Sequence, residues 1–263
     1  MRPLEELPPA ARRKIRFVLT DMDDTLTFRG RLSGATYGAM EKLREAGFVL
    51  VPVTAAPAGW CDLIARMWPV DAVIGENGGL YFRREADGQA IQREFWLPAD
   101  ERARAMARLA ETARGILLAA AEARPASDQP FRETTWAIEP LGRGDRRAAT
   151  AEEVARVWRA AGMRSTINSL WVLGWVGDFD KLAMSLRMAS ELYAADLSSE
   201  RDAVIYVGDS LNDEPMFEYF PNSVGVSMVA QYLDRMRAPP RWTTRGPGGA
   251  GFVEVADALL AAR

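Results

Sequence analysis

The stretch Ile15-Arg-Phe-Val-Leu-Thr-Asp21-Met-Asp-Asp-Thr25 decides how the rest of the chain is interpreted. Its first six residues form a short run with β propensity, and the acidic residues follow directly. Such an acidic turn often does no more than cap a helix, here through Asp23 or Thr25. The alternative is that two carboxylates lie at the carboxyl end of a parallel strand, where open α/β sheets bind their ligands.

A second acidic turn follows another apolar run. Residues 204–207 read Val-Ile-Tyr-Val, and Gly208-Asp-Ser-Leu-Asn-Asp213 comes directly after them. These residues also fit a simple turn in which Asp213 caps a following helix. Two acidic strand ends in one sheet would repel each other unless a cation lay between them. Because the candidate ligands are all oxygens, the pair of motifs predicts Mg²⁺ instead of a softer metal.

The composition excludes several kinds of chemistry. The chain of 263 residues contains no His and a single Cys, Cys61. Histidine-dependent triads, His-ligated zinc, cysteine-cluster metal sites and an internal disulfide are therefore ruled out. Catalysis would have to use carboxylates, hydroxyls, Lys or Arg, with or without a metal bound through oxygen.

Charge and hydropathy indicate where the protein acts and what it binds. The 33 basic and 36 acidic residues give a net charge of −3, which disfavours nucleic acid as a partner. Residues 1–16 lack the apolar stretch of a secretory signal, and no run approaches the ~18 apolar residues of a membrane span. We therefore expect a soluble cytoplasmic protein, a monomer or homodimer, with a small-molecule ligand and no membrane partner.

Strands and helices alternate in the first and last thirds of the chain. Residues 15–20, 48–53 and 204–207 are apolar runs separated by helical patterns. Such runs are typical of a parallel sheet that is covered by helices on both faces. The sequence predicts an α/β, Rossmann-like core.

The middle of the chain has a different character. Strand-like runs are separated there by long helices, one of which is predicted to begin at a capping box at Thr150. We predict that residues 83–178 form an inserted α+β cap domain. The core would then consist of residues 1–82 and 179–263.

With these motifs in place, the chain resembles the phosphatases of the haloacid dehalogenase superfamily nearly from end to end. Asp21, Asp23 and Thr25 match the first motif of that family, and Asp209 and Asp213 match the fourth.

Two further matches support the resemblance. Thr54, after the apolar run 49–53, matches the hydroxyl of the second motif, and Lys181 matches the family's lysine although the chain has only three lysines. The long insert follows Glu76-Asn-Gly-Gly79, which resembles the placement of the large cap in subfamily IIB. That Cof-like branch includes sucrose-phosphate and mannosylphosphoglycerate phosphatases and phosphomannomutases.

The resemblance implies a role for each matched residue. Asp21 would be the nucleophile that forms an aspartyl-phosphate, and Asp23 would act first as general acid and then as general base. Thr54 would bind a phosphoryl oxygen, and Lys181 would neutralise Asp21 and the phosphoryl group. The Mg²⁺ ligands would be Asp21, the backbone carbonyl of Asp23, Asp209, and Asn212 or Asp213.

One departure from the family pattern leaves the substrate class open. Many relatives continue the second motif with Gly-Arg, whereas this chain continues with Ala55 and Ala56. Substrate contacts are therefore predicted from position, with a packing role as the alternative for each residue. The candidates are Thr25, Ala55, Asn77 and Arg132, followed by Glu76, Thr134, Trp171 and Trp175.

Three functional hypotheses follow from the sequence. The first is a Mg²⁺-dependent phosphomonoesterase for a small phosphorylated metabolite such as a sugar phosphate. The second is a phosphomutase on the same scaffold, and the third is a non-catalytic module that binds sugar phosphates. Pure binding does not need the general acid Asp23, which counts against the third.

Overall fold

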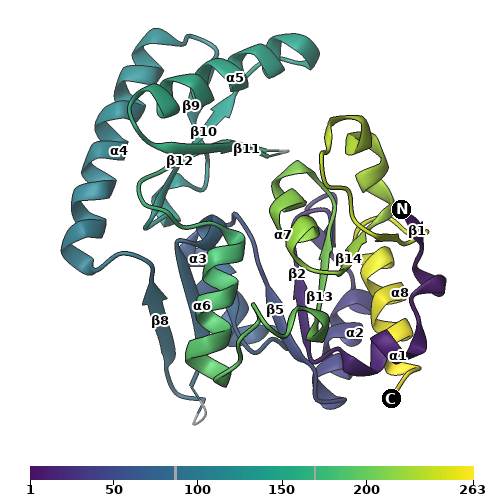
Figure 1. The fold of residues 1–263 in the computed structure, drawn as a ribbon. Helices are drawn as coiled ribbons and strands as arrows, with labels where there is room; N and C mark the ends of the chain where they lie inside the picture. The colour runs from purple at the N-terminus through teal and green to yellow at the C-terminus, as the bar shows by residue number, and fades with distance from the viewer. Residues whose placement is uncertain (86–87, 169) are drawn as a thin grey trace.

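The computed structural model describes residues 1–85, 88–168 and 170–263, and its centre is a six-stranded parallel sheet (Figure 1). Its strands, in spatial order, are β1 (Arg2–Pro3), β15 (Trp242–Thr243), β14 (Asn222–Gly225), β13 (Val204–Gly208), β2 (Phe17–Thr20) and β5 (Val49–Pro52). Strands β13 and β2 are parallel neighbours, with Val207 opposite Thr20. The acidic turns that follow these two strands therefore meet at one edge of the sheet.

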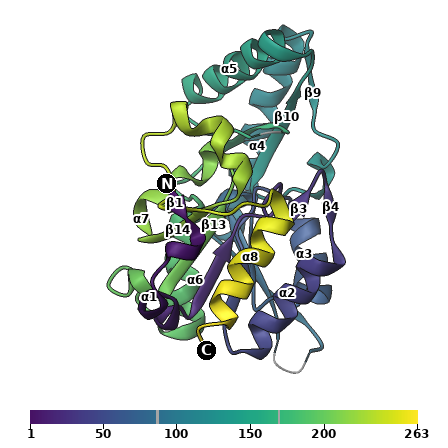
Figure 2. The same ribbon diagram turned by 90° about the vertical axis from the view of Figure 1, so that its right-hand side faces the viewer.

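Helices cover both faces of this sheet. Strand β2 shows the division, because Val18 packs into the apolar cluster on one face while Phe17 and Leu19 pack into the cluster on the other. The first face is covered by α2 (Gly34–Glu45), α3 (Ala58–Met67) and α8 (Gly248–Leu260), and the second by α6 (Lys181–Tyr193) and α7 (Glu214–Tyr219). In Figure 2, α2 and α8 lie side by side in front of the sheet. Burial on both faces explains the continuous apolar runs, and the predicted α/β class is confirmed.

A three-stranded antiparallel sheet extends the core beyond β5. It consists of β6 (Val73–Gly75), β7 (Leu80–Arg84) and β8 (Ile91–Phe95), and Ile74 forms a parallel bridge with Val53. The predicted domain boundary at residue 83 falls inside β7. Strand β8 lies beyond that boundary but pairs with β7 along its whole length. The rings of Phe82 and Phe95 also pack edge to face, with their centroids 5.8 Å apart. These pairings favour a boundary after β8, near residue 96.

The inserted part of the chain has its own sheet and its own apolar cluster. Helices α4 (Ala99–Ala119) and α5 (Gly144–Ala160) pack on one face of an antiparallel sheet around the buried Trp158. The strands of that sheet, in spatial order, are β11 (Arg164–Ile167), β12 (Val172–Trp175), β10 (Thr135–Pro140) and β9 (Ala123–Pro125). In Figure 1 this layer stands above the carboxyl edge of the parallel sheet.

One predicted helix start is wrong. Helix α5 begins at Gly144, six residues before the capping box predicted at Thr150. The Thr150 hydroxyl donates instead to the carbonyl of Arg146, one turn earlier in the same helix.

The remaining elements are short. They are η1 (Leu4–Glu6), α1 (Pro9–Lys14), β3 (Thr27–Phe28), β4 (Arg31–Leu32), η2 (Glu76–Gly78), η3 (Gln129–Phe131), η4 (Arg201–Ala203), η5 (Leu211–Asp213) and η6 (Ser227–Arg235). Within the described ranges, no helix is both long and apolar enough to cross a lipid bilayer.

Candidate active site

Three carboxylates and one lysine meet where β2 and β13 end. Asp21, Asp209 and Asp213 each place a carboxylate oxygen within 4.8 Å of the others, and all three residues are buried. The Nζ of Lys181 lies 2.6 Å from Oδ1 of Asp21 and 2.7 Å from Oδ1 of Asp213. We call these four residues the acidic cluster. It contains three acids and one base, so it is short of positive charge.

Burial and crowding change the protonation of this cluster. Burial, followed by the neighbouring Asp21 and Asp213, raises the pKa of Asp209 to about 9. Burial also raises the pKa of Asp21 to about 7, against the opposing effect of Lys181. Burial alone would lower the pKa of Lys181, but the two carboxylates it contacts raise it above its ordinary value. Lys181 therefore stays charged.

Asp213 is held by four donors. Its Oδ1 accepts from Lys181 and from the hydroxyl of Tyr206 at 2.6 Å, and its Oδ2 accepts from the backbone N–H groups of Asp209 and Ser210. A carboxylate has about four lone-pair sites, so these bonds occupy it fully. A Cβ at Gly208 would lie 2.6 Å from the Asp213 carboxyl carbon, which explains why a glycine precedes Asp209.

Asp209 is held by Thr25. The Thr25 hydroxyl is fully buried and donates to Oδ1 of Asp209 at 3.2 Å. The prediction that Thr25 contacts substrate is not supported by this geometry, because its hydroxyl hydrogen is already used. Asn212, a predicted Mg²⁺ ligand, lines the same small pocket as Asp21 and Asp209, and its Oδ1 accepts from the Ser210 hydroxyl.

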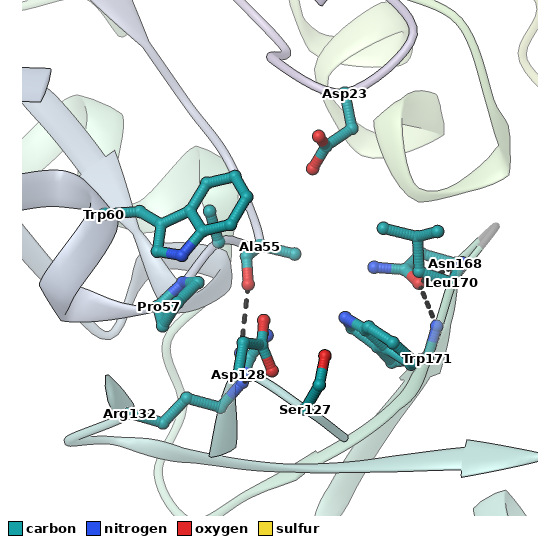
Figure 3. Close-up of a pocket in the computed structure, with 11 residues that line it drawn as sticks. Asp23, Ala55, Pro57, Trp60, Ser127, Asp128, Arg132, Asn168, Leu170 and Trp171 are labelled. Atoms are coloured by element: carbon teal, nitrogen blue, oxygen red, sulfur yellow. Dashed lines mark hydrogen bonds and ion pairs between the residues drawn. The ribbon is translucent and has the colours of Figure 1, made fainter. Parts of the chain in front are cut away.

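Asp23 lies beside the acidic cluster but faces a larger cavity. It lines the small pocket together with Asp21 and Asp209, and its carboxylate also points into the cavity of Figure 3. Burial, followed by the charge of Asp24, raises the pKa of Asp23 to about 6. A group with this pKa can both donate and accept a proton near neutral pH.

The loop after β5 borders the site on its other side. The Oγ1 of Thr54 accepts from the backbone N–H of Ala56 at 3.0 Å, so its hydroxyl hydrogen is left to donate elsewhere. Ala55, predicted to contact substrate, lines both pockets. Asn77 lies in the left-handed region with φ 59°, donates its N–H to the Thr54 carbonyl, and faces a separate opening beside Lys181.

Glu76 joins the core to the inserted part. It is fully buried, and its Oε1 accepts from the N–H groups of Ala58 and Glu133. Its Oε2 accepts from both the N–H and the hydroxyl of Thr134 and of Thr135, at 2.7–2.9 Å. Glu76 and Thr134 therefore bind each other, not a substrate.

The tryptophans divide between packing and the cavity. Trp175 stacks on Phe179 with ring centroids 5.8 Å apart and donates its indole N–H to the Phe179 carbonyl, so it has the predicted packing role. Trp171 lines the cavity beside Asp23.

Arg132 and Asp128 form a buried ion pair in the cavity wall (Figure 3). The Nε and Nη2 of Arg132 bond the two oxygens of Asp128 at 3.1 and 2.7 Å. Its Nη1 donates to the Ala55 carbonyl and to the Thr135 hydroxyl, both at 3.0 Å. Arg132, predicted to contact substrate, thus lines the cavity, but its guanidinium is hydrogen-bonded to groups of the protein.

Several residues of the site were missed at the sequence level. Tyr206 lies inside an apolar strand, where the sequence does not show whether a tyrosine only packs or also uses its hydroxyl in a hydrogen bond. Asp128 and Arg132 flank the short 3-10 helix η3 (Gln129–Phe131), where a spacing of four residues does not predict a pair as it does in an α-helix. Trp60 and Ser127 belong to the same cavity and carried no motif.

Comparison with known proteins gives the fold. No family model and no curated protein matches the chain. Protein 0175 of Thermoplasma acidophilum has a similar solved structure, with a TM-score of 0.69, 17% identity, and coverage of 93% of this chain and 98% of the other. The sucrose-phosphatase of Synechocystis sp. PCC6803, solved with sucrose and phosphate, gives a TM-score of 0.65, 12% identity, and coverage of 92% and 97%.

A phosphatase of the haloalkanoate enzyme superfamily from Bacteroides thetaiotaomicron has a TM-score of 0.60 and 19% identity, and the match covers 95% of this chain and 96% of the other. The likeness extends over both the core and the insert in all three cases. The chain has the fold of the haloacid dehalogenase-like hydrolases.

Proposed function

We propose that the protein is a Mg²⁺-dependent phosphatase that hydrolyses a small phosphorylated metabolite, such as a sugar phosphate, through an aspartyl-phosphate on Asp21. The observation that carries the proposal is the acidic cluster itself, in which three carboxylates lie together and a single lysine contacts two of them. The fold it shares with solved phosphatases supports the assignment.

The donors at the cluster fit a hard divalent cation. Carboxylate oxygens of Asp21 and Asp209 lie close together, and the cluster lacks the positive charge to balance them. Asp21, Asp209 and the backbone carbonyl of Asp23 would hold Mg²⁺, with Asn212 next to them. Because four donors already occupy Asp213, we assign it to positioning Lys181 and the loop after β13. When bound, the ion would neutralise charge on the phosphoryl oxygens.

The two aspartates would divide the chemistry. Oδ1 of Asp21 is bonded to Lys181, which leaves Oδ2 to attack phosphorus and form the aspartyl-phosphate. As the ester bond breaks, Asp23 would give its proton to the leaving oxygen. Asp23 would then take a proton from the water that hydrolyses the aspartyl-phosphate, which restores both carboxyl groups.

Lys181 and Thr54 would bind the phosphoryl group. Lys181 contacts Asp21 directly and would oppose the negative charge that builds up on the transferred phosphoryl oxygens. The free hydrogen of the Thr54 hydroxyl would bond one of those oxygens. Substrate class, binding of Mg²⁺, the cytoplasmic location, the monomeric or dimeric state and the absence of nucleic-acid and membrane partners stay predictions.

A hydrolysis assay with a nucleophile variant tests this function. The purified protein is incubated with p-nitrophenyl phosphate and a panel of sugar phosphates, with and without Mg²⁺, and released phosphate is measured. We expect Mg²⁺-dependent release, which Asp21→Asn lowers by ~10⁴-fold or more because the amide cannot attack phosphorus. Asp24→Asn is the matched control: Asp24 has φ 56°, which Asn also tolerates, and we expect at most a few-fold loss.

The other two hypotheses have their own outcomes in this assay. A hexose 1-phosphate in the panel detects a mutase, which would convert it to an isomer without release of phosphate. A folded protein that binds sugar phosphates but hydrolyses none of the panel would favour the binding module. Undiminished hydrolysis by Asp21→Asn would remove Asp21 from the role of nucleophile.

A further inference from the structure

The cavity beside Asp23 is where the leaving group of a substrate would lie. This argument rests on the proposed function, in which Asp23 protonates the leaving oxygen. The cavity has a volume of about 170 Å³ and opens directly from the Asp23 carboxylate. Pockets for drug-sized ligands are typically about 300–1,000 Å³, so this one suits a compact group.

Three of the described residues that line the cavity carry ionisable groups. These groups are Asp23, Asp128 and Arg132. Arg132 is used by Asp128, Ala55 and Thr135, and only 1% of its side chain is exposed. The Asp128 side chain is 14% exposed, so the ion pair presents its carboxylate end to the cavity and keeps its cationic end buried.

The rest of the described lining is uncharged. The indoles of Trp60 and Trp171 flank the cavity, and Ser127 and Asn168 add polar groups without charge (Figure 3). Such a wall can pack against the faces of a ring and bond hydroxyl groups. It offers no free cation to balance a carboxylate or a second phosphate.

We propose that Asp128 sets the substrate specificity of this site by excluding phosphate esters whose leaving group carries an anionic group. A carboxylate or phosphate in the cavity would face the carboxylate of Asp128, which is largely buried, and the two like charges would repel each other. An uncharged leaving group meets no such repulsion. The substrates are therefore monophosphates of neutral compounds, and bisphosphates and phosphorylated acids are rejected.

The test uses two esters that differ in one charge, phenyl phosphate and 4-carboxyphenyl phosphate. The specificity ratio is kcat/KM for the first divided by kcat/KM for the second, measured by phosphate release with Mg²⁺ present. We expect a ratio of ~10 or more for the wild-type protein. Asp128→Asn leaves Arg132 without its counter-charge and should lower the ratio by ~10-fold or more, whereas Asp128→Glu should keep it high.

Two further variants make the test independent of folding defects. Asp62→Asn is the matched control, because Asp62 also pairs with arginines (Arg66 and Arg93) but lies outside the cavity lining, and its ratio should equal that of the wild type. Asp128→Asn combined with Arg132→Gln removes both charges and leaves no buried cation unpaired. Its ratio should lie between those of the wild type and Asp128→Asn, and circular dichroism verifies that each variant folds.

The outcomes separate this inference from the proposed function. Hydrolysis of both esters by the wild type with equal kcat/KM overturns the inference and leaves the phosphatase assignment standing. An unchanged ratio in Asp128→Asn, or in the double variant, overturns it as well. Hydrolysis of neither ester by folded wild-type protein with Mg²⁺ overturns the proposed function and the inference together.

Discussion

Among the residues that the structure describes, buried charged side chains form two groups, and their charges are balanced differently. In the acidic cluster, three carboxylates lie together, and Lys181 pairs with two of them. At the junction between core and insert, Glu76 accepts six hydrogen bonds, and Asp128 is matched by Arg132. A buried charge is tolerated when hydrogen bonds or a counter-charge offset its desolvation. The junction meets that requirement with the protein's own groups, whereas the cluster is short of positive charge and fits a site that is completed by a ligand.

Removing the base from the cluster should have the largest effect. Lys181→Met leaves two buried carboxylates, Asp21 and Asp213, without their cation. We expect hydrolysis to fall by ~10³-fold or more, and the free energy of unfolding to fall by about 3–5 kcal/mol, because breaking a buried ion pair leaves an uncompensated charge. Steady-state kinetics and urea unfolding measure the two effects.

The surface lysine Lys14 is the matched control. It forms a 2.8 Å ion pair with Asp202, but both side chains are more than half exposed. Lys14→Met should change the unfolding free energy little and leave hydrolysis unchanged, because water screens an exposed ion pair. Equal effects of the two substitutions would mean that the cluster is no more dependent on its cation than a surface pair, and the comparison would fail.

The junction should respond in stability more than in chemistry. In Glu76→Gln the side-chain amide faces at least two N–H or O–H donors, whichever way it is turned, because both oxygens of Glu76 accept hydrogen bonds. We expect the unfolding free energy to fall by about 3 kcal/mol, which corresponds to a Tm lower by roughly 6–12 °C. Thermal unfolding followed by circular dichroism measures the shift.

Glu139→Gln provides the control for the junction, because Glu139 pairs with the exposed Arg124 on the surface of the insert. Its Tm should change by no more than a few degrees. If Glu76→Gln kept its stability but lost hydrolysis, the junction would serve the reaction directly, and the contrast between the two groups would need to be redrawn.

The same contrast explains what could be predicted from the sequence. Asp21 and Asp209 follow apolar strand runs, and parallel neighbouring strands bring their carboxyl ends together, so their proximity was predictable. Lys181 and Thr54 were found through the family resemblance. The α/β class followed from the buried apolar strands. Strand β8 was predicted to belong to the insert, because its pairing with β7 depends on tertiary contacts that the sequence does not show.

The junction could not be predicted in the same way. Three of the five hydrogen bonds that residues 133–135 donate to Glu76 use backbone N–H groups, which every residue but proline has and no motif records. The Asp128–Arg132 pair flanks the short 3-10 helix η3, where a spacing of four residues does not predict a side-chain pair as it does in an α-helix. Contacts between the two parts of the chain depend on how their surfaces meet, and the sequence does not show that.

Adding the cation should have the smallest effect on stability, and its sign tests the comparison most directly. If the cluster is short of positive charge, Mg²⁺ should stabilise the wild-type protein, by about 2.7 kcal/mol at a concentration one hundred times Kd, or roughly 5–11 °C in Tm. Asp209→Asn removes one ligand and one titratable group while keeping the shape of the side chain. Its metal-free Tm at neutral pH should lie above that of the metal-free wild type, because the raised pKa of Asp209 means that this carboxylate must take up a proton on folding, whereas Asn need not. Mg²⁺ should raise the Tm of this variant little. Asp62→Asn, on α3, should respond to Mg²⁺ as the wild type does.

Two outcomes would contradict this prediction. If Mg²⁺ raised the Tm of Asp209→Asn as much as that of the wild type, the ion would bind elsewhere. If the metal-free Tm of Asp209→Asn lay below that of the wild type, Thr25 and its neighbours would already satisfy Asp209, and the cluster, like the junction, would be complete without a ligand.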